Sequence, residues 1–178
     1  HIKQEVVEDA LEVLTEERLV KVLEPAKNSA FGTEMLARPR FYFAEQRIVE
    51  NFQRLIDSEA FTKFDAERDL IASQENRLGI ELDTVQLEAI HAALQNKVLI
   101  ITGGPGTGKT TLVRFILGLM SRRIPSVALA APTGRAAKRL TETTSYQAST
   151  IHRLLEADSM GFQRNRDQPL ESELLIID

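Results

Sequence analysis

The chain has 178 residues, 43% of them hydrophobic, which is enough apolar surface for one or two compact domains. It has no cysteine, which excludes disulfides and thiolate metal sites, and no apolar stretch near the roughly 20 residues of a membrane span. We therefore expect a cytoplasmic protein without a membrane partner. The net charge of −4 is uneven, because residues 1–96 hold 11 Lys and Arg against 19 Asp and Glu, and residues 97–178 hold 11 against 7. The basic surplus indicates either a local face for nucleic acid or ordinary surface scatter.

Residues 1–60 are expected to form a small α+β region. Apolar residues at helical spacing predict a helix from Val6 to about Glu17 and another from Ala44 to Ser58. Between them, residues 19–23 are predicted to be a short strand, residues 25–38 a loop or wing, and residues 41–43 the returning strand. This order resembles the later part of a winged helix and fits a plain α+β prefix equally well. Residues 61–79 are charged and are predicted to be a helical connector to a domain over residues 80–178.

Gln86 lies shortly before a glycine-rich segment and allows two interpretations. Its amide offers one donor and one acceptor, which match the N6 donor and N7 acceptor of adenine. Asp83 followed three residues later by Gln86 is also the pattern of a capping box at the start of a helix. The spacing alone favours the cap.

A phosphate-binding loop follows the apolar run at 98–101, which we expect to be a strand buried on both faces. Its glycines allow backbone N–H groups to surround a phosphate. Lys109 brings a positive charge to the β- and γ-phosphates, and the Thr110 hydroxyl is suited to Mg²⁺. Leu112, Phe115, Ile116 and Leu119 form the apolar stripe of the helix that follows. The sequence therefore predicts an ATP and Mg²⁺ site over Gly103, Gly104, Pro105, Gly106, Thr107, Gly108, Lys109, Thr110 and Thr111.

A second segment with chemistry follows the predicted strand at 127–131. Pro132, Thr133 and Gly134 end this strand and begin a helix whose N–H groups can receive a phosphate. Arg135, Lys138 and Arg139 lie in its first turns, where the helix dipole disfavours cations. This placement indicates an anionic partner, and the alternative is a solvated basic face.

Further candidates lie towards the end of the chain. Thr150 is suited to capping a short helix or bonding a backbone phosphate, and His152 is suited to the latter. Asp178 ends the apolar run at 174–177, in the position of an acidic residue that holds Mg²⁺ opposite the loop. The alternation of strands and helices predicts an α/β fold with a parallel sheet, helices on both faces and ligands at the carboxyl ends of the strands.

These segments resemble the RecD family of superfamily 1 DNA helicases. The resemblance rests on Gln86 with its flank and on residues 102–111, 131–140, 150–155, 161–165, 169–170 and 174–178. It implies a RecA-like P-loop NTPase domain, with Gln86 at adenine and Lys109 in catalysis. It also implies that Pro132, Thr133, Thr150 and His152 contact single-stranded DNA. The expected activity is ATP-dependent translocation from 5′ to 3′ on single-stranded DNA, or on a duplex with a 5′ overhang, together with other recombination subunits.

The first and last residues suggest a piece of a longer protein, because the chain has no initiator Met and stops within an apolar strand. We expect this piece to bind nucleotide without unwinding DNA, because a second domain and the glutamate that follows Asp178 in the family are absent from it. Two alternatives remain. One is a P-loop ATPase that remodels a nucleoprotein without unwinding, and the other is a docking role for residues 1–60.

Overall fold

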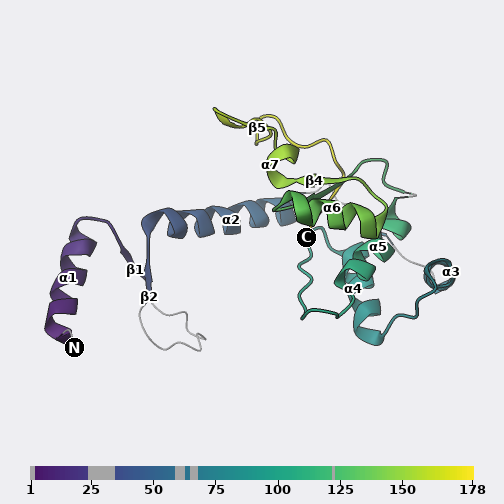
Figure 1. Cartoon of the computed structure of the whole chain (residues 1–178), viewed down its shortest axis with the longest axis horizontal. Helices are drawn as coiled ribbons and strands as arrows, with labels where there is room; N and C mark the ends of the chain where they lie inside the picture. The colour runs from purple at the N-terminus through teal and green to yellow at the C-terminus, as the bar shows by residue number, and fades with distance from the viewer. Residues whose placement is uncertain (1–2, 24–34, 59–62, 65–67, 122) are drawn as a thin grey trace. The chain divides into compact units, whose positions relative to one another are not determined.

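The computed structural model describes residues 3–23, 35–58, 63–64, 68–121 and 123–178. The chain divides into two compact units, residues 1–60 and residues 61–178. Figure 1 shows the order of the helices and strands within each unit, coloured from purple at the N-terminus to yellow at the C-terminus.

The described residues of the first unit form two helices and a two-stranded antiparallel sheet: α1 (Gln4–Glu16), β1 (Lys21–Leu23), β2 (Met35–Ala37) and α2 (Pro39–Asp57). The register pairs Lys21 with Ala37 and Leu23 with Met35. The helix from Val6 and the strand within 19–23 are thus confirmed. No residue of either helix is buried.

The predicted returning strand at residues 41–43 is wrong. These residues lie in the first turns of α2, and the returning strand is β2, inside the segment predicted to be a loop. Pro39 explains the difference, because its fixed φ suits the first turn of a helix and it keeps Arg38 extended, at φ −66° and ψ 135°. Residues 25–34 of the predicted wing lie outside the described residues.

The second unit is built around a parallel sheet with the strand order β4 (Ala148–Thr150), β3 (Val127–Ala131), β7 (Leu174–Ile177). The parallel arrangement and the strands at 127–131 and 174–177 are confirmed. β4 was not predicted, because a three-residue strand carries too little periodicity to detect. The helices are α3 (Arg68–Leu78), α4 (Thr84–Gln95), α5 (Lys109–Met120), α6 (Gly134–Thr144) and α7 (Ile151–Leu154), and a hairpin joins β5 (Ala157–Asp158) to β6 (Gly161–Phe162).

Helix α5 is central to the core of this unit. Its predicted apolar stripe is confirmed, because all four of those side chains are buried. They belong to a cluster with residues of α3 and α4, while Leu117 joins a second cluster with β3, β4 and α6. Helices α5 and α6 lie against each other (Figure 1).

Helices were expected on both faces of the sheet. In the part of the chain that the structure describes, helices cover the face that carries Leu174 and Ile176. Side chains alternate between the faces of a strand. On β7, Leu174 and Ile176 pack against the core clusters, whereas Leu175 and Ile177 are 41% and 58% exposed. On β7, the face that carries Leu175 and Ile177 is therefore partly exposed, although Ala130 of β3, which pairs with Ile177, is 0% exposed.

The predicted strand at residues 98–101 is not formed. This segment has no ladder pairing, and Ile100 is 73% exposed, so it is not buried on both faces. An apolar segment forms a strand only where its backbone N–H and C=O groups hydrogen-bond to a neighbouring strand. Leu99 and Ile101 instead line a pocket beside β7.

Candidate nucleotide and nucleic-acid site

The glycine-rich segment forms a loop that leads directly into α5. Gly106 and Gly108 have φ values of +81° and +78°, a left-handed conformation that glycine adopts without the strain of a Cβ atom. Gly108 is the N-cap of α5, so the free N–H groups of the first turn face the loop. At Gly103, a Cβ atom would lie 2.7 Å from Thr107 Oγ1. The backbone therefore has the tight curvature that an anion-binding loop needs.

Lys109 is folded over this loop. Its Nζ donates to the carbonyl oxygens of Gly103 and Gly104, at 2.7 and 2.6 Å, and lies 3.5 Å from Thr107 Oγ1. Thr107 Oγ1 in turn donates to Gly104 O at 3.0 Å. The ammonium group is thus held at the loop by carbonyl oxygens, which the oxygens of a phosphate can replace as stronger, charged acceptors. The residues present fit a bound triphosphate.

Gln86 caps α4 and also lies against the loop. Gln86 N–H donates to Asp83 Oδ1 at 2.8 Å, and Asp83 N–H donates to Gln86 Oε1 at 3.2 Å, so the capping box is confirmed. A Cβ atom at Gly108 would lie 2.9 Å from Gln86 Nε2. The amide therefore reaches the loop from 22 residues earlier in the chain, which no local pattern in the sequence indicated. Its contact with adenine stays a prediction.

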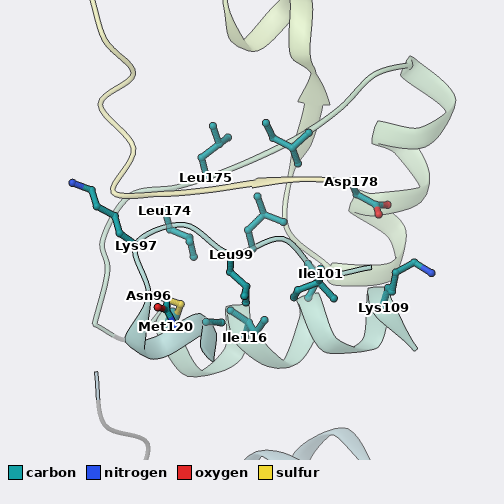
Figure 2. Close-up of a pocket in the computed structure, with 14 residues that line it drawn as sticks. Asn96, Lys97, Leu99, Ile101, Lys109, Ile116, Met120, Leu174, Leu175 and Asp178 are labelled. Carbon is teal, nitrogen blue, oxygen red and sulfur yellow. The ribbon is translucent and has the colours of Figure 1, made fainter. Parts of the chain in front are cut away.

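Asp178 and Lys109 lie at the same end of a pocket of about 210 Å³ (Figure 2). The Asp178 N–H donates to Ala130 O at 3.0 Å, which extends the pairing of β7 with β3 and positions the carboxylate. Thr110 lies half-buried in the first turn of α5, followed by the half-buried Thr111. In the described part of the chain, no group of three or more His, Cys, Asp or Glu side chains could hold a metal ion. Mg²⁺ at Thr110 and Asp178 would thus take its remaining ligands from water and phosphate, as this ion often does.

The residues predicted to contact nucleic acid begin the helices after β3 and β4. Thr133 caps α6 by accepting from Ala136 N–H at 3.2 Å, and Thr150 caps α7 by accepting from Arg153 N–H at 3.1 Å. Pro132 is exposed beside Thr133. Because β3, β4 and β7 are parallel, these caps and Asp178 lie at one edge of the sheet, where the strands end. We call it the carboxyl edge.

The basic side chains of α6 are exposed to solvent. Arg135 is exposed, and Lys138 is 79% exposed although its Nζ lies 3.9 Å from Glu142 Oε1. A pair this exposed contributes little to stability, so Lys138 is available to an anion. His152 is exposed on α7, and its ring centroid lies 5.8 Å from that of Phe162 on β6. The sequence did not predict this ring contact, because ten residues and a turn separate the two side chains.

Among the residues that the structure describes, no helix has the length and apolar character needed to cross a membrane.

Comparison with known proteins places this site in a family. A family model described as an AAA domain matches residues 86–178. The ATP-dependent RecD2 DNA helicase of Deinococcus radiodurans is 40% identical over 97 residues, which are 54% of this chain and 14% of that protein. The RecBCD enzyme subunit RecD of Mycolicibacterium smegmatis is 35% identical over 119 residues, 52% of this chain and 22% of that protein. The ATP-dependent DNA helicase dda of phage T4 is 35% identical over 98 residues, 54% of this chain and 21% of that protein.

The chain thus spans between 14% and 22% of the length of these three relatives. The predicted resemblance to RecD-type helicases is confirmed. Because the AAA domain match covers more than half of its residues, the chain belongs to the AAA domain family.

Proposed function

We propose that the chain binds ATP with Mg²⁺ and supplies the first RecA-like domain of a cytoplasmic DNA helicase that moves from 5′ to 3′ along single-stranded DNA. Residues 80–178 form this domain, residues 61–79 connect it to the preceding region, and residues 1–60 are winged-helix-like. One observation carries the proposal. Lys109 lines the same pocket as Asp178, and the helix caps Thr133 and Thr150 lie with Asp178 at the carboxyl edge of one sheet. Its similarity to RecD2, RecD and dda supports the same activity and recombination subunits as partners.

At the nucleotide, each residue has a distinct role in this proposal. The N–H groups of residues 103–111 surround the phosphates, and Lys109 exchanges its carbonyl contacts for β- and γ-phosphate oxygens. Thr110 and Asp178 hold Mg²⁺, and Gln86 hydrogen-bonds adenine through its amide. When bound, ATP supplies the phosphoanhydride bond whose hydrolysis drives translocation.

At the nucleic acid, the carboxyl edge holds one strand by its phosphates. Pro132 and Thr133 contact the backbone from the start of α6, and Thr150 and His152 contact it from α7. Arg135 and Lys138 neutralise phosphate charge, so affinity falls as salt rises. β3 lies directly between β4 and β7. A shift of β7 on nucleotide binding is therefore transmitted through backbone hydrogen bonds of the sheet to the residues that bind the DNA backbone.

Thermal unfolding of the 178-residue chain with Mg-ATP tests the nucleotide site. Nucleotide at about 100 times its dissociation constant stabilises the folded state by about 2.7 kcal/mol. Lys109→Ala should abolish this stabilisation. The matched control is Lys97→Ala, at the opposite end of the same pocket (Figure 2), which should keep it. An equal stabilisation of wild type and Lys109→Ala would contradict the proposal.

Unwinding is tested in a protein of the relatives' full length that contains this chain. Such a protein should separate a duplex with a 5′ overhang and leave one with a 3′ overhang intact. Thr133→Ala should weaken single-strand binding while the thermal effect of Mg-ATP persists. Unwinding of the 3′-tailed duplex alone would refute the direction of movement.

A further inference from the structure

Aromatic rings and cations gather where β2 passes into α2, in the first unit. They come from β1, from the residue before α2 and from the first two turns of α2. We call this group the aromatic–basic cluster; it consists of Lys21, Arg38, Arg40, Phe41, Tyr42 and Phe43.

Two of the cations, Lys21 and Arg40, lie over the rings. Lys21 Nζ is 4.0 Å from the centroid of the Tyr42 ring and 5.4 Å from that of Phe43. The Tyr42 and Phe43 rings meet edge to face, with centroids 5.3 Å apart. Arg40 Cζ lies 4.6 Å from the centroid of the Phe41 ring. Strand pairing brings these groups together, because Lys21 is opposite Ala37, next to the Arg38 N-cap of α2.

The packing stripe of α2 does not account for all of these rings. Ile48, Phe52 and Leu55 follow helical spacing along one side of α2. Phe43 precedes Phe52 by nine residues, and at about 100° per residue it lies on the opposite side of the helix. Phe43 is 52% exposed, whereas Phe41, eleven residues before Phe52, lies on the same side of α2 as the stripe and is 54% exposed. An exposed aromatic ring outside the apolar stripe indicates a surface that contacts a flat ligand.

The charge around the rings favours an anionic ligand. Residues 35–44 contain Arg38 and Arg40 and no Asp or Glu, and the first turn of α2 has no acidic residue. Helix α1 of the same unit carries five acidic and no basic residues. Cations are therefore concentrated at the rings in a unit that is acidic elsewhere. Single-stranded nucleic acid offers both phosphates for cations and unpaired bases for rings.

We propose that the aromatic–basic cluster binds single-stranded nucleic acid, with bases stacked on Phe41 and Phe43 and phosphates neutralised by Arg38 and Arg40. This site belongs to the first unit and is additional to the carboxyl edge of the second. Stacking on aromatic faces does not depend on base identity, so binding at the cluster tolerates any sequence.

Fluorescence anisotropy of a labelled oligothymidylate with the 178-residue chain tests the proposal. The variant Phe41→Leu/Phe43→Leu keeps apolar side chains but removes the rings, and it should weaken binding by about fivefold or more. The matched control is Phe52→Leu, which removes one 40% exposed ring eleven residues further along α2 than Phe41, on the side opposite Phe43, and should leave the affinity unchanged.

A second pair of variants tests the charges. Arg38→Gln/Arg40→Gln should lower the slope of log affinity against log salt by about 1.4, because each contact with a single strand contributes about 0.7. Arg47→Gln/Arg54→Gln, further along α2, is the matched control and should keep the slope. Far-ultraviolet circular dichroism checks that each variant retains its helix content.

A separate variant, Arg135→Gln/Lys138→Gln, distinguishes this inference from the proposed function, because it changes only the basic residues of α6 in the second unit. If these changes weaken binding but the cluster variants do not, the inference is overturned and the carboxyl edge stands. If only the cluster variants weaken it, the inference holds and the role of the carboxyl edge fails. If neither the cluster variants nor the α6 variant weaken oligonucleotide binding, the inference is overturned. It is also overturned if the cluster binds anionic vesicles and no oligonucleotide. In both cases the thermal effect of Mg-ATP still tests the nucleotide site.

Discussion

Replacing Gly108 with alanine would test whether the glycine-rich loop and Gln86 are energetically coupled. Gly108 has a φ of +78°, and a left-handed conformation costs an alanine about 1–2 kcal/mol. The new Cβ atom would also lie 2.9 Å from Gln86 Nε2 and displace that amide. The displaced amide loses its bond from Asp83 N–H, and half of a capping box is worth about 1 kcal/mol. We therefore expect Gly108→Ala to lower the free energy of unfolding by about 2–3 kcal/mol.

Gly106→Ala is the matched control. Gly106 has nearly the same φ, +81°, but a Cβ atom there would meet no atom within 4 Å. Only the backbone cost of about 1–2 kcal/mol should remain. In a Gln86→Ala background the amide is already absent, so Gly108→Ala should cost no more than Gly106→Ala. The double-mutant cycle of Gly108 and Gln86 should thus give a coupling of about 1 kcal/mol.

Equilibrium urea unfolding measures these differences in the second unit alone. The chain has no tryptophan and two tyrosines, one in each unit. In a Tyr42→Phe background, tyrosine fluorescence reports only on Tyr146, which packs against the cluster formed by α5, α6 and the sheet. Additivity of Gly108→Ala and Gln86→Ala within about 0.3–0.5 kcal/mol would refute the linkage. The assignment of Gln86 to the nucleotide site would then lose its structural support.

Three further changes probe the same unit. Phe115→Ala removes a ring that is 0% exposed at the centre of the core, and urea unfolding should show a loss of about 3–5 kcal/mol. Asp83→Ala removes the acceptor of the α4 cap, so the same measurement should show a loss of about 1 kcal/mol, and no change would mean that the cap is not formed in solution. Glu156→Gln breaks a 3.0 Å pair with Arg164, but both side chains are partly exposed, so a loss above about 1 kcal/mol on urea unfolding would contradict this reasoning.

The local elements of the second unit were largely predictable. The stripe from Leu112 to Leu119 defined α5, and the spacing of Asp83 and Gln86 defined the start of α4, because helix periodicity and capping act within a few residues. The strand at 98–101 and the aromatic strand at 41–43 were wrong for a common reason. Both rested on residue preference alone, whereas a strand exists only where a partner backbone pairs with it.

The sequence by itself determined the glycine-rich loop, because the glycines that allow its left-handed turns and the lysine that follows them are adjacent in the chain. Only the tertiary structure decided that Gln86 reaches Gly108, that Asp178 shares a pocket with Lys109, and that Thr133 and Thr150 lie at one edge. These relations depend on sheet order and helix packing, which join residues far apart in sequence and leave no local pattern. The same holds for Lys21 over Tyr42, which the pairing of β1 with β2 brings together.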